Sequence, residues 1–253
     1  MLGQNFNIKN RALKSRDFFL NLLFPIECLG CGKEKFWLCD ECFKKLRFNQ
    51  TQYCLKCKKE NNLGYFCYNC QENYSLDGCL IAGDYQDKLL SLLIKNFKYR
   101  FIKNLNAELG NFAVLFLYNL QKNIIEEYPA YPKIFINLDS SIVVPVPLHK
   151  KRLNWRGFNQ SEKIAEIIAK SFELNLSLEL FREKYKKPQA KLKAKKRKEN
   201  IKNCFVWKGE NLKNSDILLI DDVTTTGSTL NECAKVLKQN GARKIWGLVI
   251  ANG

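Results

Sequence analysis

Four CxxC pairs lie close together in the N-terminal part of the chain. Eight of the 11 cysteines form them: Cys28 and Cys31, Cys39 and Cys42, Cys54 and Cys57, Cys67 and Cys70. A CxxC turn directs two thiolates at one ion, and two such turns supply the tetrahedral all-sulfur shell that zinc prefers. The spacing therefore predicts two zinc sites, built either from successive pairs or from interleaved pairs. Disulfides suit secreted proteins better, and iron–sulfur ligands are usually spaced less evenly.

These zinc sites are expected to be structural. Four protein sulfurs saturate each ion and leave no position for a substrate. The segment that carries them has few aliphatic residues, so zinc, which contributes ~10 to 16 kcal/mol in small zinc domains, is expected to hold it folded. The remaining cysteines stand alone within apolar patterns and are predicted core residues: Cys79, Cys204 and Cys233.

The chain carries a large excess of positive charge. Its 253 residues include 42 Lys and Arg against 25 Asp and Glu, a net charge of +17. Polyanions such as nucleic acid, an anionic membrane surface or a phosphorylated metabolite are therefore the expected partners. A general abundance of Lys and Asn explains part of the excess equally well. With 46% hydrophobic residues, the chain can form one large folded domain and a small one.

The apolar stretch FFLNLLF, residues 18–24, follows several basic residues and faintly resembles a targeting signal. Asn21 interrupts it, it is too short to span a membrane, and no small-residue cleavage site follows. We interpret it as an amphipathic helix that ends before Pro25. No other stretch approaches the ~20 apolar residues of a spanning helix, so the protein is expected to be soluble and cytoplasmic.

From about residue 76 the apolar pattern alternates between strands and helices. Strands are predicted at 78–85, 141–147, 215–220 and 244–250, and helices at 87–100, 104–127, 160–172 and 228–242. Strands separated by helices of this length form a parallel sheet through right-handed crossovers, with helices on both faces. The predicted fold class is α/β, with a small zinc domain at residues 1–75 and a parallel-sheet domain at residues 76–253.

The last strand–helix unit contains the run ILLIDDVTTTGSTL, residues 217–230. ILLI is typical of a central parallel strand and TLNECAKVL of a helix, so DDVTTTGST is predicted at the carboxyl edge of the sheet, where open α/β folds bind ligands. The amides of residues 225–229 can cradle a phosphate, and Gly227 allows its close approach. Asp221 and Asp222 would repel a phosphate, so they are expected to face ribose hydroxyls or a magnesium ion.

This pattern predicts a sugar phosphate as ligand. No Lys follows Gly227, which argues against a P-loop nucleotide site. The alternative is an ordinary strand–loop–helix in which Ser and Thr only cap the helix. We expect the loop to lie at the sheet edge, away from the cysteine-rich segment.

Three stretches carry a resemblance to known families. ILLIDDVTTTGST resembles the phosphoribosyl pyrophosphate (PRPP) motif of type I phosphoribosyltransferases. VPVPLHKKRLNWRGFNQSE is similar to an element of the ComF/GntX family, which is associated with bacterial competence for DNA uptake, although Lys150 replaces a usual proline. A third stretch has residues spaced as in that family: Gln189, Leu192, Arg197, Asn200 and Phe205. In this stretch Lys186 occupies a position where Thr is common in the family. The eight cysteines resemble its double zinc ribbon, so nearly the whole chain is covered and a type I phosphoribosyltransferase-like core is implied.

The resemblance implies roles for residues at the sheet edge. Asp221 and Asp222 would bind the ribose hydroxyls of magnesium-bound PRPP. The 5-phosphate would be held by Thr225, Thr226, Gly227, Ser228 and Thr229. The loop after Val144 would meet the pyrophosphate through His149, Lys151 and Arg152, with help from Arg156. For His149 a surface or capping role is an equal alternative, and no catalytic base is assigned.

Two classes of function follow from the resemblance. In the first, the chain is a PRPP-binding protein of DNA uptake that binds single-stranded DNA or RNA and competence-machinery proteins. The basic run 184–202 and the zinc module would contact the nucleic acid. That run is alternatively a cover over the ligand site or a solvated loop, and Tyr65, Phe66 and Tyr68 of the zinc module either stack on bases or pack internally. In the second class, the chain is an active phosphoribosyltransferase that releases pyrophosphate as an amine or base attacks PRPP; the sequence contains no recognisable acceptor pocket.

Overall fold

The computed structural model describes residues 25–127, 141–184 and 201–253, apart from the single positions 62, 73, 101, 103 and 202. The predicted N-terminal helix and nearly all of the basic run 184–202 lie outside these residues. So do four residues of the family pattern: Gln189, Leu192, Arg197 and Asn200. Within the described part of the chain, no helix is both long and apolar enough to cross a membrane.

The chain divides into two compact units, Met1–Leu46 and Arg47–Gly253. The first contains the first two CxxC pairs and the short helix α2 (Asp40–Phe43). The second contains the other two pairs, the short helix α3 (Tyr68–Gln71) and the whole sheet. The second cysteine group thus belongs to the compact unit of the sheet. The predicted domain boundary after residue 75 divides the chain elsewhere and stays a prediction.

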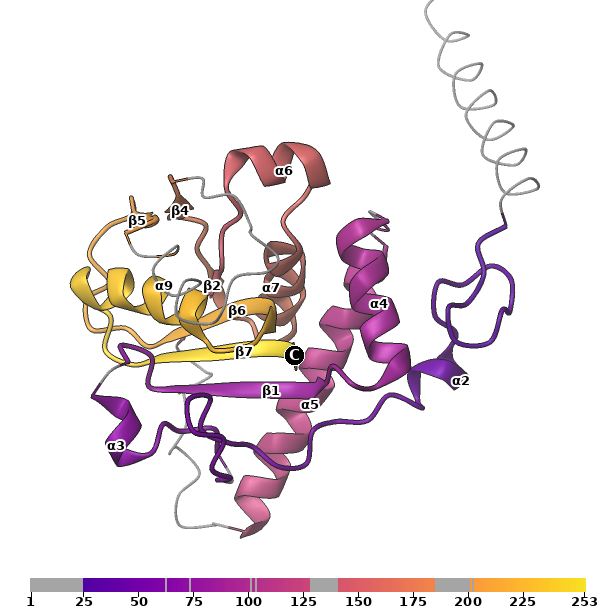
Figure 1. The fold of residues 1–253 in the computed structure, drawn as a ribbon, viewed down its shortest axis with the longest axis horizontal. Helices are drawn as coiled ribbons and strands as arrows, with labels where there is room; N and C mark the ends of the chain where they lie inside the picture. The colour runs from indigo at the N-terminus through magenta and orange to yellow at the C-terminus, as the bar shows by residue number, and fades with distance from the viewer. Residues whose placement is uncertain are drawn as a thin grey trace, which may run out of the picture. The chain divides into compact units, whose positions relative to one another are not determined.

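A five-stranded parallel sheet forms the centre of the second unit (Figure 1). In the spatial order β1-β7-β6-β2-β3, its strands are Gly78–Asp84, Ile245–Asn252, Ile217–Thr224, Ile142–Pro145 and Asn175–Leu176. Every pairing in this sheet is parallel, which confirms the predicted α/β class. A separate antiparallel hairpin consists of β4 (Leu180–Arg182) and β5 (Phe205–Trp207).

Helices connect the strands of the sheet. They are α4 (Lys88–Tyr99), α5 (Leu105–Glu127), α6 (Lys150–Arg156), α7 (Gln160–Ser171) and α9 (Ser228–Gln239). Ile217 and Leu219 of β6 belong to one apolar cluster with Leu230 of α9. Leu218 and Ile220 lie outside that cluster because neighbouring strand residues point to opposite faces, and α5 and α7 pack on that other side. The three single cysteines are buried, as predicted: Cys79, Cys204 and Cys233.

Candidate functional site

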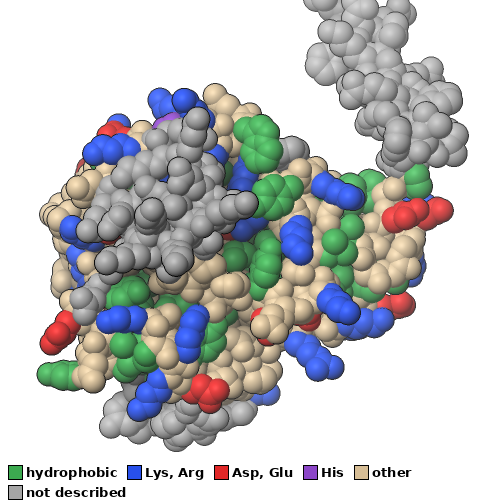
Figure 2. Space-filling model, viewed as in Figure 1, with side chains coloured by type: hydrophobic (Ala, Val, Ile, Leu, Met, Phe, Trp, Pro, Cys, Tyr) green, Lys and Arg blue, Asp and Glu red, His purple; other side chains and the backbone are tan. Residues whose placement is uncertain are grey.

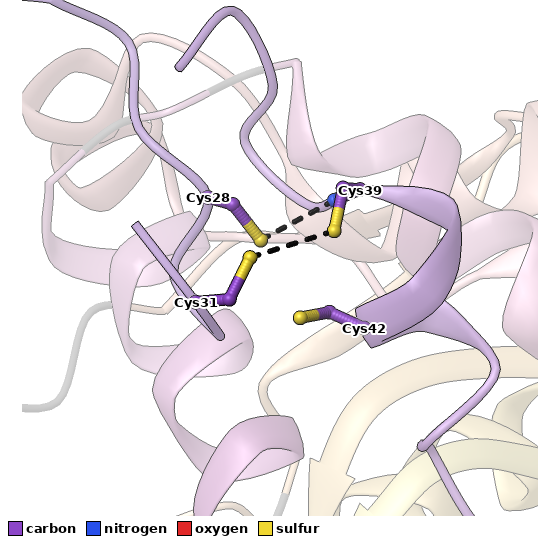
Figure 3. Close-up of side chains that lie close together, drawn as sticks. All are labelled: Cys28, Cys31, Cys39 and Cys42. Carbon is purple, nitrogen blue, oxygen red and sulfur yellow. Dashed lines mark hydrogen bonds between the residues drawn. The ribbon is translucent and has the colours of Figure 1, made fainter. Parts of the chain in front are cut away.

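The eight cysteines form two groups of four, and each group comes from successive CxxC pairs. The first group converges as Figure 3 shows, with one Sγ atom from each of Cys28, Cys31, Cys39 and Cys42, all within 4.8 Å of one another. The same limit holds for the second group: Cys54, Cys57, Cys67 and Cys70. Four sulfurs at this spacing fit the tetrahedral shell of zinc. The structure therefore selects successive over interleaved pairing.

The two groups repeat one local fold. The first CxxC turn of each is closed by a β-bridge, between Glu27 and Glu34 in one and between Tyr53 and Glu60 in the other. The third cysteine of each group occupies the N-cap position of the short helix that follows, α2 or α3, without a capping bond from its side chain. Corresponding positions can thus be compared between the groups. Cys31 and Cys57 occupy the equivalent position in the two groups, and both are exposed.

Backbone N–H groups favour the charged form of one sulfur in each group. Burial acts to raise the pKa of the Cys28 thiol, but N–H donors of Cys39, Gly30 and Cys31 bring it down to about 6. In the second group burial again opposes the shift, and the equivalent donors lower the pKa of Cys54 to about 6. The thiolate is the form that binds a metal, so both turns are suited to zinc.

Protein purified without chelator is expected to contain two zinc ions per chain, because two complete four-sulfur sets are present. Metal analysis should therefore give a ratio near two. Acidification should release both ions, since protons compete with zinc for the thiolates. A ratio near zero, or the visible absorption of an iron–sulfur cluster, would contradict this assignment.

Strand β6 extends further than the sequence predicted. It continues through both aspartates to Thr224, because pairing with β7 persists as far as Asn252. The turn that follows ends at Gly227, which has a φ of 70° and lies at the N-terminus of α9. Such a positive φ favours glycine. The Gly227 N–H donates to Thr224 Oγ1 at 3.1 Å, and the hydroxyls of Thr226 and Ser228 are 2.8 Å apart.

The two aspartates of β6 have different partners, as expected for neighbouring strand residues that point to opposite faces. Asp221 Oδ1 accepts a hydrogen bond from Ser161 Oγ at 2.9 Å. Asp222 Oδ1 lies 2.8 Å from Nζ of Lys98. Burial, followed by the negative charge of Asp222, raises the pKa of Asp221 to about 7. Asp222 is thus held in an ion pair, whereas burial favours the neutral form of Asp221.

Helix α6 carries the cations predicted to follow β2. His149 caps this helix, since its Nδ1 accepts a hydrogen bond from the Lys151 N–H at 3.2 Å. Capping is one of the roles that the sequence left open for it. At the other end, Arg156 donates to Gln160 Oε1 at 2.8 Å, and its guanidinium lies 5.7 Å from the centroid of the Tyr99 ring. Helix α6 is thereby joined to α7 and α4.

Two arginines have a buried Nε atom without a hydrogen-bond partner among the described residues: Arg156 and Arg182. Burial lowers the pKa of both, and Arg152 lowers them further by repulsion. The charges of Asp222 and Asp221 oppose this shift. The charges of the β6 aspartates thus act on guanidinium groups from both α6 and β4, and each of these groups keeps one buried donor without a described partner.

The second cysteine group packs against the turn between β6 and α9, so the expectation that this loop lies away from the cysteine-rich segment was wrong. A Cβ atom placed on Gly227 would lie 2.9 Å from Cδ1 of Leu55, inside the CxxC turn. The Tyr74 hydroxyl donates to the Thr226 carbonyl at 3.3 Å. The sequence separation concealed this contact, because about 170 residues lie between the turn and Leu55.

Asn252, at the end of β7, bonds both to the turn between β6 and α9 and to residues beside the second cysteine group. In the amide orientation that satisfies all its neighbours, its nitrogen donates to the carbonyls of Thr224 at 3.0 Å and Thr225 at 3.1 Å. Its oxygen accepts from Lys58 Nζ at 2.9 Å and from the Tyr53 hydroxyl at 2.6 Å. The backbone position of the turn thus depends on residues that flank the second cysteine group.

Several of these residues were not predicted: Lys98, Ser161, Arg182 and Asn252. Ser161 lies in the RGFNQSE stretch, so the motif contained a signal for it. Lys98 belongs to an ordinary amphipathic helix and had none. Of the zinc-module aromatics, Phe66 is buried against Tyr74, with 4.2 Å between ring centroids, and Tyr65 packs edge-on against Trp246 at 4.7 Å. Only Tyr68, 85% exposed, could meet a base.

Comparison with known proteins matches both halves of the chain. Residues 19–71 match the double zinc ribbon domain, and residues 159–252 match the phosphoribosyl transferase domain. The chain is 31% identical to competence protein F of Haemophilus influenzae over 90% of its own length and 98% of that protein. It is 28% identical to competence protein ComFC of Bacillus subtilis, covering 81% of this chain and 79% of that protein.

A further relative is the DNA utilization protein YhgH of Escherichia coli, 35% identical over 42% of this chain and 48% of that protein. The matched ribbon domain contains both cysteine groups, and the matched transferase domain contains β6, its turn and α9. The resemblance noted in the sequence is thereby confirmed. This chain belongs to the ComF family, the family of competence protein F.

Proposed function

We propose that this protein binds PRPP with magnesium at the carboxyl edge of its sheet and acts in the handling of single-stranded DNA during DNA uptake. Asp221 and Asp222 bind the ribose hydroxyls. The 5-phosphate is held by Thr225, Thr226, Gly227, Ser228 and Thr229. The pyrophosphate faces α6, where the candidate contacts are His149, Lys151, Arg152 and Arg156. Arg182 of β4 joins this set as a cation that the sequence did not indicate.

One observation carries the proposal: three complementary features meet at a single sheet edge. The turn before α9 directs a helix N-terminus toward that edge, which favours a phosphate. The carboxylates of β6 accept hydrogen bonds from hydroxyl groups. Arg156 and Arg182 hold buried donors without partners among the described residues. PRPP has a phosphate at one end, a diol in the middle and a pyrophosphate at the other end, in the same order.

Magnesium fits this donor set, because carboxylate and phosphate oxygens are the ligands it prefers. Asp221 and Asp222 are the residues that would hold it beside the ribose. When bound, the ion neutralises pyrophosphate charge. The chain's own contribution is to position PRPP and to supply guanidinium donors to the pyrophosphate.

The role in DNA uptake rests on the names of the relatives, competence proteins and a DNA utilization protein. A net charge of +17 supports a polyanionic partner. We place the protein in the cytoplasm, together with competence-machinery proteins. The expected signature is binding of single-stranded DNA that weakens with salt, with a log–log slope of about −0.7 per phosphate contacted.

Turnover of PRPP is the second candidate function, and a cavity favours it. The cavity measures ≈ 380 Å³ and opens at the carboxyl ends of β1 and β7, beside Asn252 and the turn between β6 and α9, which we call the motif turn. Tyr53, Asp84 and Tyr85 line it and could hold a flat acceptor with amine groups. Assays of pyrophosphate release with nucleobases, amines and DNA ends separate the candidates. Release with any of these acceptors establishes a transferase, and none with all of them leaves PRPP binding alone.

Replacing either aspartate of β6 by asparagine is expected to weaken PRPP binding about ten- to a hundredfold. A hydrogen bond to a charged acceptor contributes about 1.5 to 3 kcal/mol, which corresponds to that range. Calorimetric titration of Asp221→Asn and Asp222→Asn with PRPP and magnesium measures the loss. Unchanged affinity in both variants would exclude the carboxylates from the site.

The same Asp221→Asn variant should not lose stability at pH 8. The folded-state pKa of Asp221 is raised to about 7, whereas the unfolded value is about 4. Ionisation therefore favours the unfolded chain increasingly from about pH 4 to pH 7, and asparagine removes this penalty. Thermal melts should place the variant level with or above wild type at pH 8, with a smaller difference at pH 5. A lower melting temperature at pH 8 would mean that the carboxylate stabilises the fold.

A further inference from the structure

Two large aromatic side chains are exposed beside the candidate PRPP site. Trp155 of α6 is 60% exposed and Tyr99 of α4 is 58% exposed. The Arg156 guanidinium lies 5.7 Å from the centroid of the Tyr99 ring, so the ends of the two helices are neighbours. In Figure 2 hydrophobic and basic side chains lie side by side over α6 and the adjoining end of α4. We call these exposed aromatics, together with Arg100 after Tyr99 and with Lys150 and Arg152 of α6, the Tyr99–Trp155 surface.

A buried aromatic contact supports this surface. Phe97 of α4 is fully buried, and its ring centroid lies 5.3 Å from that of Phe158, which follows α6. Lys98 is also fixed, through its ion pair with Asp222 at 2.8 Å. The backbone just before Tyr99 and just after Trp155 is therefore anchored. Exposed rings on an anchored backbone lose little conformational entropy when a partner binds.

The chemistry of the surface indicates which partner it fits. Large exposed aromatics mark interaction sites, and protein–protein interfaces are enriched in Tyr, Trp and Arg but depleted of Lys. Here Arg100 and Lys150 are exposed and Arg152 is partly exposed, at the end of α4 and on α6. Single-stranded nucleic acid offers both a phosphate for each cation and an open base face for each ring. Duplex DNA stacks its bases internally and offers no such face.

We propose that the Tyr99–Trp155 surface is where single-stranded DNA binds, with bases stacked on the two rings and phosphates contacted by the neighbouring cations. The inference rests on the single-stranded DNA part of the proposed function and gives it a location. It differs from the sequence-based expectation, which placed the contacts in the basic run 184–202 and the zinc module. Because Lys98, the residue before Tyr99, forms an ion pair with Asp222, the bound strand lies next to the PRPP site.

The test compares a fluorescent oligothymidylate of about 20 nucleotides with an abasic strand of the same length, which keeps the phosphates and lacks the bases. Trp155→Ala and Tyr99→Ala are each expected to weaken oligothymidylate binding about five- to a hundredfold, the range measured for loss of one stacked base. Their affinity for the abasic strand should stay within about twofold of wild type. Arg100→Gln should weaken both probes and reduce the salt slope by about 0.7.

Tyr118→Ala is the matched control. Tyr118 is 48% exposed and bonds to the Ser171 carbonyl at the end of α7, whereas Ser161 at the start of α7 contacts Asp221. The ten residues from Ser161 to Ser171 place it about 15 Å away along that helix. This variant should bind both probes like wild type. PRPP titration of Trp155→Ala, which should match wild type, confirms that the site beside it is intact.

Each other outcome overturns the inference in a distinct way. If Trp155→Ala and Tyr99→Ala bind oligothymidylate like wild type, the strand binds elsewhere. If they lose affinity for both probes equally, the rings do not stack on bases. If they lose binding to anionic lipid vesicles and keep oligothymidylate, the surface serves a membrane. If wild type binds no oligothymidylate at low salt, the DNA part of the proposed function fails as well, while PRPP binding is judged separately by calorimetry.

Discussion

Cys57→Ser is expected to abolish measurable PRPP binding, whereas Cys31→Ser leaves it within about twofold of wild type. Each change removes one exposed ligand at the equivalent position of its cysteine group, and loss of a ligand forfeits much of the ~10 to 16 kcal/mol that structural zinc contributes. The second group contacts the motif turn through Leu55 and Tyr74, and Lys58 beside it bonds to Asn252, which in turn bonds to the turn; the first group belongs to the other compact unit. Its loosening removes the support of that turn, and we expect affinity to fall more than a hundredfold.

Metal analysis and calorimetry on the same two preparations measure this difference. Both variants should lose one zinc ion, which makes them matched in metal content. Equal PRPP affinity in the two variants would show that the second cysteine group does not position the turn. Loss of binding in both would indicate that the two groups fold together, and would likewise contradict the account.

Gly227→Val is expected to eliminate PRPP binding for two reasons that add. The φ of 70° at this position strains a β-branched residue. Its Cβ would also lie 2.9 Å from Cδ1 of Leu55, so the Leu55 side chain would have to move. Relief of the backbone strain moves amides that are proposed to hold the 5-phosphate. Calorimetric titration should detect no binding at millimolar PRPP.

Gly241→Val is the control for this substitution. Gly241 has a φ of 94°, and an added Cβ would meet the side chain of Asn211 at 2.7 Å, so the local strain is comparable. It follows the carboxyl end of α9, whereas Gly227 precedes the amino end. This variant should melt earlier than wild type and still bind PRPP. If it loses PRPP binding as completely as Gly227→Val, general destabilisation explains both results.

The sheet was predictable from sequence because its local signals agree. Apolar runs such as Ile217–Ile220 alternate with amphipathic helices, and this order restricts the topology to a parallel sheet. The motif turn was predictable because a glycine among hydroxyl residues, placed after a buried strand, is typical of a turn that leads into a helix. The end of β6 was not, because Asp221 and Asp222 have low strand propensity and are kept in the strand by pairing with β7.

Contacts between distant segments account for the rest of the difference. Lys98 reads as one of many surface lysines, and only the fold brings it to Asp222. In the sequence Leu55 is only one of the two residues between the cysteines of a CxxC turn, yet in the structure it is buried against Gly227. The eight cysteines look like one module in sequence, although the two groups fall into different compact units. These facts depend on tertiary packing, which a local pattern does not encode.

The central claim is that the edge formed by β6, its turn and α6 binds PRPP. Isothermal titration of zinc-loaded, full-length protein with PRPP in the presence of magnesium tests it most directly. We expect saturable binding to one site per chain with a dissociation constant below millimolar, and loss of most of that affinity in Asp222→Asn. No heat of binding at millimolar PRPP, or equal affinity in wild type and Asp222→Asn, would contradict the claim.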